Sequence, residues 1–232
     1  MKASEFAGKG KRTLQRLVPA SVIQAQLHRR VIMQFAEKVG LVYFGYVDQR
    51  NDEHRLVRGL TLSANHRDNH YCIGTYEGYD ITLVERRDTI RFPGKSTKTH
   101  NWIIMTFDLR TTIDLPHVFM GLHTHSETFY AHLFTKFSNL TKVSLAAYGM
   151  YDKSFSGRYA LYTTPDQALN VASLIDPALA KIIGDHFGGL TFEITDGCLY
   201  LYADDQRTTH VLLEKMLKYG IWLSQTIDFR TK

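Results

Sequence analysis

The sequence has few of the features that stabilise secreted or membrane-spanning proteins. Two cysteines in 232 residues, Cys72 and Cys198, are too few for a disulfide framework and indicate free thiols in a reducing compartment. No apolar run approaches the ~20 residues of a membrane-spanning helix, and the N-terminus lacks the apolar segment of a secretory signal. With 5 prolines, 16 glycines and 22% charged residues, the composition excludes a fibrous or disordered chain. We expect a globular cytoplasmic protein, either free or peripheral to the membrane.

The motifs of nucleophilic and nucleotide-dependent catalysis are also missing. The sequence contains no Gly-x-Ser-x-Gly elbow, no Walker A loop and no dinucleotide-binding fingerprint. Cys72 lies in apolar strand-like sequence and Cys198 lies beside a predicted turn, so both are expected to pack in the interior. The sequence therefore favours a protein without enzymatic activity and without a cofactor.

Basic residues are concentrated at the N-terminus. The net charge of the chain is +5, but residues 1–30 carry seven basic residues against one acidic residue, a net charge of +6. The remaining 202 residues are almost neutral, at −1. Such an arm attracts polyanions, so the expected partners are an anionic membrane surface, nucleic acid or an acidic protein. The residues predicted to bind the anion are Lys2, Lys9, Lys11, Arg12, Arg16, Arg29 and Arg30.

An amphipathic helix is predicted directly after this arm, which we expect to be disordered over residues 1–20. Ser21 and Gln24 have the spacing of a capping box, and Gly40 stands where a helix C-cap is expected. Between them, apolar residues recur every four positions and predict a buried stripe on a helix over about 22–39. The residues of that stripe are Ile23, Leu27, Val31, Phe35 and Val39.

The middle of the chain changes to a period of two, which is typical of strands. Strands are predicted over 41–47, 56–62, 71–76, 79–86, 102–109 and 117–122, with loops over 87–101 and through the polar stretch 66–70. Short links between them favour an antiparallel sheet. Ser126 then caps a helix bearing Phe129, Leu133 and Phe137, and residues 149–157 are expected to form a loop at a domain boundary.

The C-terminal third predicts a strand, a helix, a hairpin and a final helix over about 208–225. Asp196-Gly197 is a strong signal for a two-residue turn, which places Ile194 opposite Leu199 and puts Phe192 on the same face. Asp204-Asp205 is interpreted as a helix start. The predicted fold class is α+β, with an arm at 1–20, a helix and sheet at 21–148, and a unit at 149–232 that packs on the sheet or forms one domain with it.

Residues 159–202 carry a Tyr-x-x-Tyr-Thr-x-Pro-Asp stretch, an Asp-Pro-x-Leu helix start and a Phe-Glu-Ile-x-Asp-Gly-x-Leu-Tyr hairpin. This segment, about a fifth of the chain, resembles the C-terminal part of some uncharacterised bacterial families of unknown function. The resemblance implies a bacterial origin. It implies no activity and transfers no catalytic residue.

Histidines supply the one constellation that suggests metal chemistry. His123 and His125 are two residues apart, so on a strand they would share a face and could bind one zinc or iron ion. Glu127 is the candidate third ligand or general base, and His132 is the candidate third imidazole.

Two functions from different classes follow from these patterns. The leading hypothesis is a non-enzymatic binding or scaffolding protein whose basic arm contacts an anionic surface or partner. The alternative hypothesis is a metal-dependent hydrolase that uses the His-x-His pair.

Overall fold

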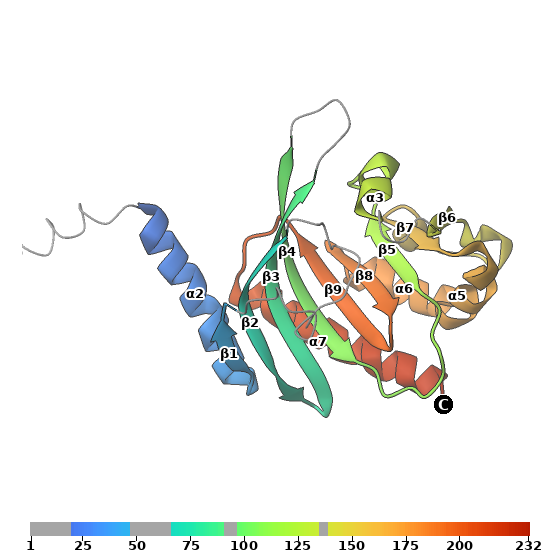
Figure 1. The fold of residues 1–232 in the computed structure, drawn as a ribbon. Helices are drawn as coiled ribbons and strands as arrows, with labels where there is room; N and C mark the ends of the chain where they lie inside the picture. Colours follow the sequence, from blue (N-terminus) through green and yellow to red (C-terminus); the bar gives the residue numbers. More distant parts are fainter. Residues whose placement is uncertain (1–19, 47–65, 91–96, 135–138) are drawn as a thin grey trace, which may run out of the picture.

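The structure, a computed structural model, describes residues 20–46, 66–90, 97–134 and 139–232, with side chains at 20–24 and 90 excepted. Its described strands form one nine-stranded antiparallel sheet in the order β1-β2-β3-β4-β9-β8-β5-β7-β6 (Figure 1). The α+β prediction is confirmed. The elements are α2 (Ala20–Val39), β1 (Val42–Gly45), β2 (Arg67–Tyr76), β3 (Tyr79–Ile90), β4 (Lys98–Asp108), β5 (Val118–Leu122), α3 (Glu127–Leu133), β6 (Thr141–Val143), η2 (Leu145–Ala147), α4 (Lys153–Ser156), β7 (Tyr159–Thr163), η3 (Pro165–Gln167), α5 (Ala168–Leu174), α6 (Pro177–His186), β8 (Leu190–Thr195), β9 (Cys198–Asp204) and α7 (His210–Arg230).

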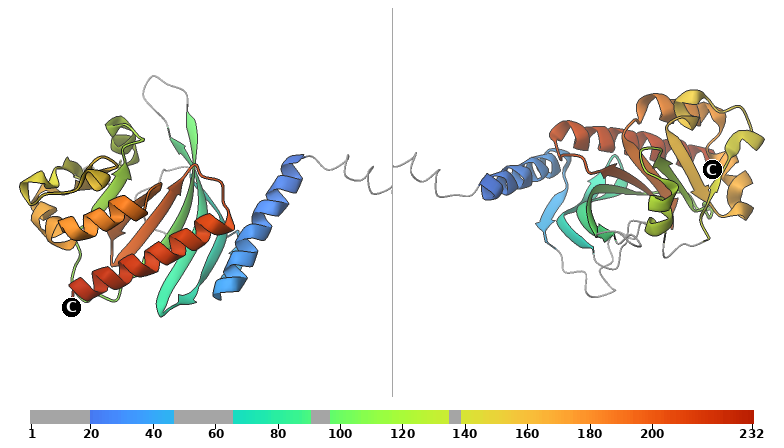
Figure 2. Two further views of the ribbon diagram at one scale, coloured as in Figure 1. Left: turned by 180° about the vertical axis from the view of Figure 1, so that it is seen from behind. Right: turned by 90° about the horizontal axis from the view of Figure 1, so that it is seen from above.

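Both faces of the sheet are covered by apolar layers. The long helix α7 runs across one face, with α6 on the same side and α2 at the β1 edge (Figure 2). Leu213 and Met216 of α7 are fully buried in this larger layer, together with Phe35 of α2. The opposite layer is aromatic: Phe129 and Tyr130 of α3 pack there with side chains of β4, β5, β7 and β9.

The β8–β9 hairpin lies in the middle of the sheet. Ile194 pairs with Leu199 and Phe192 pairs with Leu201, so the predicted register is confirmed. Asp196 and Gly197 have φ angles of +51° and +71°, as a two-residue hairpin turn requires. On its outer sides, β9 pairs with β4 and β8 pairs with β5. The sheet is therefore continuous across the expected boundary at 149–157, where the short helix α4 replaces part of the predicted loop.

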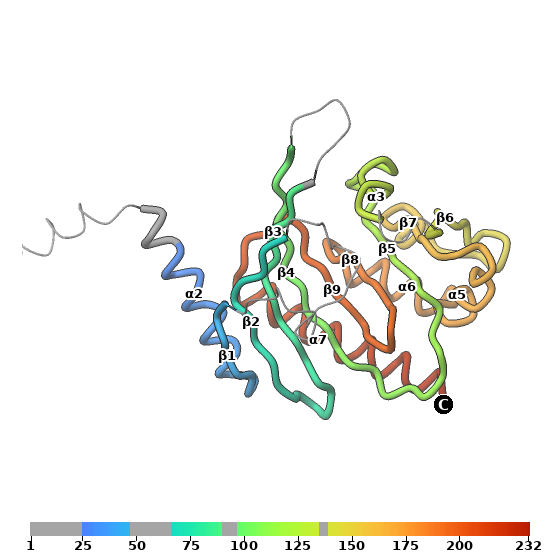
Figure 3. The backbone as a smooth tube through the Cα atoms, viewed as in Figure 1, coloured from blue at the N-terminus to red at the C-terminus, as the bar shows by residue number. Residues whose placement is uncertain are grey.

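Two predicted loops are wrong over their described residues, because strands β2, β3 and β4 are longer than predicted, and β3 and β4 run side by side (Figure 3). Residues 67–70 belong to β2, and the loop predicted over 87–101 contains the end of β3 and the start of β4. Arg86 explains much of this extension: its guanidinium donates two 2.7 Å hydrogen bonds to the carboxylate of Asp68, and both side chains are buried. Paired charges can thus occupy the interior where an apolar pattern was expected.

Helix α2 is confirmed, but its N-terminal half is not buried as the stripe predicted. Phe35 and Val39 face the core, whereas the side chain of Leu27 is 52% exposed. The reason is visible in Figure 1, where the first turns of α2 extend beyond the edge of the sheet. The predicted arm over 1–20, except for Ala20 in α2, the predicted strand at 56–62 and Phe137 lie outside the described residues. The cap of α3 by Ser126 is confirmed, since its hydroxyl accepts a hydrogen bond from the Phe129 amide.

Candidate functional site

The structure separates most members of the predicted His-x-His site. The His123 ring lies 3.2 Å from the carbonyl oxygen of Ser156, at a cavity of about 740 Å³. The His132 ring bonds to the Thr128 carbonyl oxygen within its own helix. Glu127 instead pairs with Lys142, at 2.5 Å. The structure does not bring His123, Glu127 and His132 together with His125, because each of the three contacts a different local partner.

His125 does converge with two other metal-ligating side chains. It belongs to a group with His100 of β4 and Asp204 of β9, whose ligand atoms all lie within 4.8 Å of one another. The two carboxylate oxygens of Asp204 contact one imidazole each, Oδ1 that of His100 and Oδ2 that of His125. Burial raises the pKa of Asp204, but the two imidazoles outweigh burial and hold that pKa below its usual value.

The interpretation of Asp204-Asp205 as a helix start is wrong. Asp204 ends β9, and Asp205 follows it with a φ of +45°. Helix α7 begins later, at His210, where the Thr209 hydroxyl accepts a hydrogen bond from the Leu212 amide.

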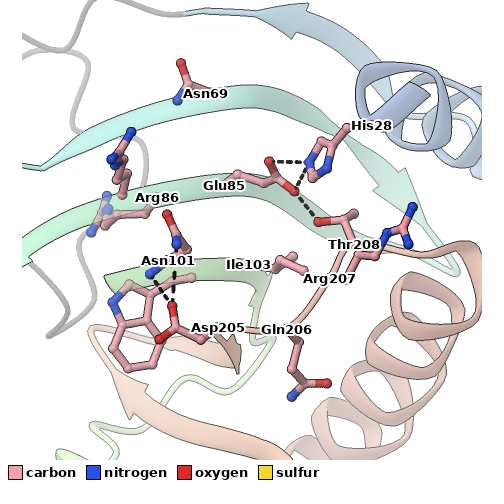
Figure 4. A pocket seen from close by; sticks show the side chains of 12 residues that line it. His28, Asn69, Glu85, Arg86, Asn101, Ile103, Asp205, Gln206, Arg207 and Thr208 are labelled. Carbon is pink, nitrogen blue, oxygen red and sulfur yellow. Dashed lines mark hydrogen bonds and ion pairs between the residues drawn. The ribbon is translucent and has the colours of Figure 1, made fainter. Parts of the chain in front are cut away.

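A second polar group lies in a pocket of about 390 Å³ between α2, the sheet and the segment before α7 (Figure 4). Its centre is Glu85 of β3. Nε2 of His28 lies 2.7 Å from both carboxylate oxygens of Glu85, and the Thr208 hydroxyl donates a hydrogen bond to one of them. Nε2 of His70, on β2, is 3.9 Å from Glu85, while its Nδ1 is 2.9 Å from the hydroxyl of Tyr43. Figure 4 shows His28 pointing from the helix toward the strand.

The two histidines beside Glu85, His28 in the pocket and His70 next to it, differ in their electrostatics. The hydrogen bond to Glu85 raises the pKa of His28, against the opposing effects of burial and of Arg207. Burial lowers the pKa of His70, and this effect exceeds the attraction of Glu85. The Glu85 carboxylate is therefore already in contact with one imidazole and accepts a hydrogen bond from one hydroxyl.

The rim of the same pocket is cationic. Arg87 and Arg207 line it and are exposed, and neither forms an ion pair with another described residue. On α2, Arg30 is exposed without an ion pair to the described residues, and Arg29 lies over the Tyr43 ring with its guanidinium carbon 5.6 Å from the centroid. The other predicted anion-binding residues, Lys2, Lys9, Lys11, Arg12 and Arg16, lie outside the described residues.

Sequence reasoning missed His28, His70, Glu85, His100 and Asp204 as members of clusters. His100 and Asp204 lie near strand ends, where polar residues are common, whereas His28, His70 and Glu85 lie within a helix or strand and come from three separate segments of the sequence. The signal that would have joined His100 to Asp204 is the pairing of β4 with β9, in which Trp102 is opposite Asp204.

Comparisons with known proteins give a fold but no family. No family model matches the chain, and no curated protein matches it in sequence. The crystal structure of the mycobacterial trehalose monomycolate transport factor A, TtfA, is similar, with a TM-score of 0.55 over 87% of this chain and 93% of that chain. The two chains are 10% identical, so the similarity is one of fold. Within the described residues, no helix is long and apolar enough to cross a bilayer.

Proposed function

We propose that this protein is a non-enzymatic binding protein that contacts an anionic membrane surface through its basic N-terminal arm. The observation that carries the proposal is the charge of residues 1–30, which include seven basic residues and only one acidic residue. Juxtamembrane basic residues each contribute about 1 kcal/mol to binding at an anionic bilayer. A polybasic arm of this size therefore suffices for peripheral attachment.

Helix α2, which follows the arm, supports a membrane over other polyanions. On α2, Arg30 is exposed close to two exposed apolar side chains, Leu27 and Met33. Cationic and apolar side chains exposed together are typical of helices that lie at a lipid interface. The shared fold with a factor of trehalose monomycolate transport is compatible with a role at a membrane. We infer a cytoplasmic location with peripheral attachment.

Vesicle co-sedimentation tests this function with the full chain. Binding is expected for vesicles of phosphatidylcholine mixed with phosphatidylglycerol, with loss of binding on vesicles of phosphatidylcholine alone. Removing residues 1–20 is expected to abolish binding, and Arg30→Glu is expected to weaken it by roughly tenfold or more, since it reverses one charge. Added salt is expected to weaken binding steeply.

The matched control is Lys218→Glu, which makes the same charge change at an exposed position of α7. It is expected to bind the mixed vesicles like the wild type. Unchanged binding after removal of residues 1–20 contradicts the proposal. Tighter binding to duplex DNA than to the mixed vesicles, at equal salt, contradicts the choice of a membrane and assigns the arm to nucleic acid.

A further inference from the structure

We propose that His100, His125 and Asp204 bind one divalent transition-metal ion of the zinc class. This site is separate from the arm and uses residues of the folded body. Two imidazoles and one carboxylate are the ligand set of many catalytic zinc and non-haem iron sites, which keep a further position open.

Three different elements bring these side chains together. His100 lies near the start of β4, Asp204 ends the neighbouring strand β9, and His125 lies in the turn between β5 and α3. Their ligand atoms lie within 4.8 Å of one another. Ligands bound tetrahedrally to zinc at about 2.1 Å are separated by about 3.4 Å, so small rotations about the side-chain bonds suffice to bind an ion.

The hydrogen bonding of this group is incomplete without an ion. The side chain of His100 is 1% exposed, and its Nε2, the ring nitrogen that faces Asp204, makes no aligned hydrogen bond to a described residue. Oδ1 of Asp204 is also buried without such a bond, although it contacts the His100 ring. Buried polar atoms are almost always hydrogen-bonded. The ligand atoms of His100, His125 and Asp204 lie close together without this alignment, which a metal ion bound between them would explain.

A carboxylate behind His100 completes the arrangement. Oδ2 of Asp205 is 3.3 Å from Nδ1 of His100, on the side of the ring away from Asp204. Asp205 itself is fixed, because its Oδ1 accepts a 2.8 Å hydrogen bond from the Asn101 amide. Metal-binding histidines commonly have a carboxylate at the second ring nitrogen, which sets the tautomer and the direction of the ring.

Aromatic side chains hold the two imidazoles in place. The His125 ring stacks on Phe129 with 4.1 Å between centroids, and the His100 ring lies 4.6 Å from Trp102. These contacts exclude water from one side of the group. The other side is more open, since the side chain of His125 is 20% exposed. An ion could enter from this side and keep a water molecule or an anion as its fourth ligand.

The group of His28, His70 and Glu85 is the weaker candidate. Its carboxylate already accepts hydrogen bonds from His28 and Thr208, and Nδ1 of His70 is bonded to Tyr43. These contacts satisfy the group without an ion.

Metal titration of the full chain, stripped with a chelator, tests the proposal. Co²⁺ is followed by its absorption spectrum and Zn²⁺ by calorimetry. One ion of either metal per chain is expected, with a tetrahedral or five-coordinate Co²⁺ spectrum. His125→Ala and Asp204→Asn are each expected to weaken Zn²⁺ binding by tenfold or more, and Zn²⁺ is expected to raise the melting temperature of the wild type but not of His125→Ala.

His123→Ala is the matched control, because it removes a histidine two residues from His125 that bonds elsewhere. It is expected to bind Zn²⁺ like the wild type. His28→Ala is expected to do the same. The proposal is overturned by the absence of stoichiometric binding in the wild type, by unchanged binding in folded His125→Ala, or by loss of binding in His28→Ala with retention in His125→Ala. Circular dichroism establishes folding of each variant.

Discussion

His28 of α2 and Glu85 of β3 hold the N-terminal helix against the sheet through a bifurcated contact, with Nε2 of the imidazole 2.7 Å from each carboxylate oxygen. The two residues are 57 positions apart in sequence, and both line the pocket that Arg207 also lines. The contact fixes the N-terminal half of α2, which extends beyond the sheet edge and so cannot be held by apolar packing alone.

The His28–Glu85 pair makes the stability of the protein depend on pH. Because Glu85 raises the pKa of His28 above its unfolded value of about 6.5, the pair contributes fully below pH 6.5 and its contribution is lost as pH rises through the raised pKa. His28→Gln is expected to lower the free energy of unfolding by about 1–2 kcal/mol at pH 6 and by less at pH 9. Urea unfolding across this pH range checks this. A difference between wild type and variant that grows with pH contradicts it.

The buried pair of Arg86 and Asp68 stabilises the extended ends of β2 and β3. Asp68→Ala removes two hydrogen bonds and the opposite charge from a buried guanidinium, so it is expected to cost about 3–5 kcal/mol in urea unfolding. Asp80→Ala, which removes an exposed carboxylate bonded to Thr75, is the control and is expected to cost less than about 1 kcal/mol. The double variant Asp68→Ala/Arg86→Met is expected to regain part of the loss. Equal costs for the two aspartates contradict the assignment.

Gly220 allows α7 to approach β4 closely. A Cβ atom at this position would overlap the ring of Phe107. At a solvent-exposed helix position, replacing glycine by alanine would stabilise the protein by about 1 kcal/mol. At this buried position Gly220→Ala is instead expected to destabilise the protein by about 1–3 kcal/mol, because the added methyl group overpacks the interior. The second change Phe107→Leu removes part of the overlap and is expected to recover some of the melting temperature lost in Gly220→Ala. A gain in melting temperature for Gly220→Ala alone contradicts this packing.

The two cysteines are expected to react slowly in the native state. Burial raises the pKa of Cys72 to about 12 and that of Cys198 to about 12, with Asp108 adding to the effect at Cys198. Relative to an unperturbed thiol, this lowers the thiolate fraction at neutral pH by roughly a thousandfold. Alkylation with iodoacetamide is followed by mass spectrometry. Both cysteines are expected to be labelled in urea, and both are expected to react much more slowly in the native protein in buffer. Rapid labelling of native Cys72 contradicts its burial.

The sequence predicted the structure correctly where the signal came from residues that are neighbours in the chain. The Asp196-Gly197 turn and the alternation around it indicated the same register, and the structure confirms it. The sites were not predictable in this way, because their members come from distant segments: His125 and Asp204 are 79 residues apart. The His-x-His pattern assumed that neighbours in sequence share a ligand, whereas the turn after β5 sends His123 and His125 to different partners. Polar strand ends such as Asp68 were missed because their charges are buried as pairs.

The place of the β8–β9 hairpin at the centre of the sheet has a consequence for synthesis on the ribosome. Strand β4 has been made by residue 108, but the strand that covers its free edge ends at residue 204. Until β9 has been synthesised, the nascent chain has an unpaired sheet edge and an incomplete hydrophobic core, and both features favour aggregation. Sheet closure therefore waits for the last third of translation, and sheets built from such distant pairings fold slowly.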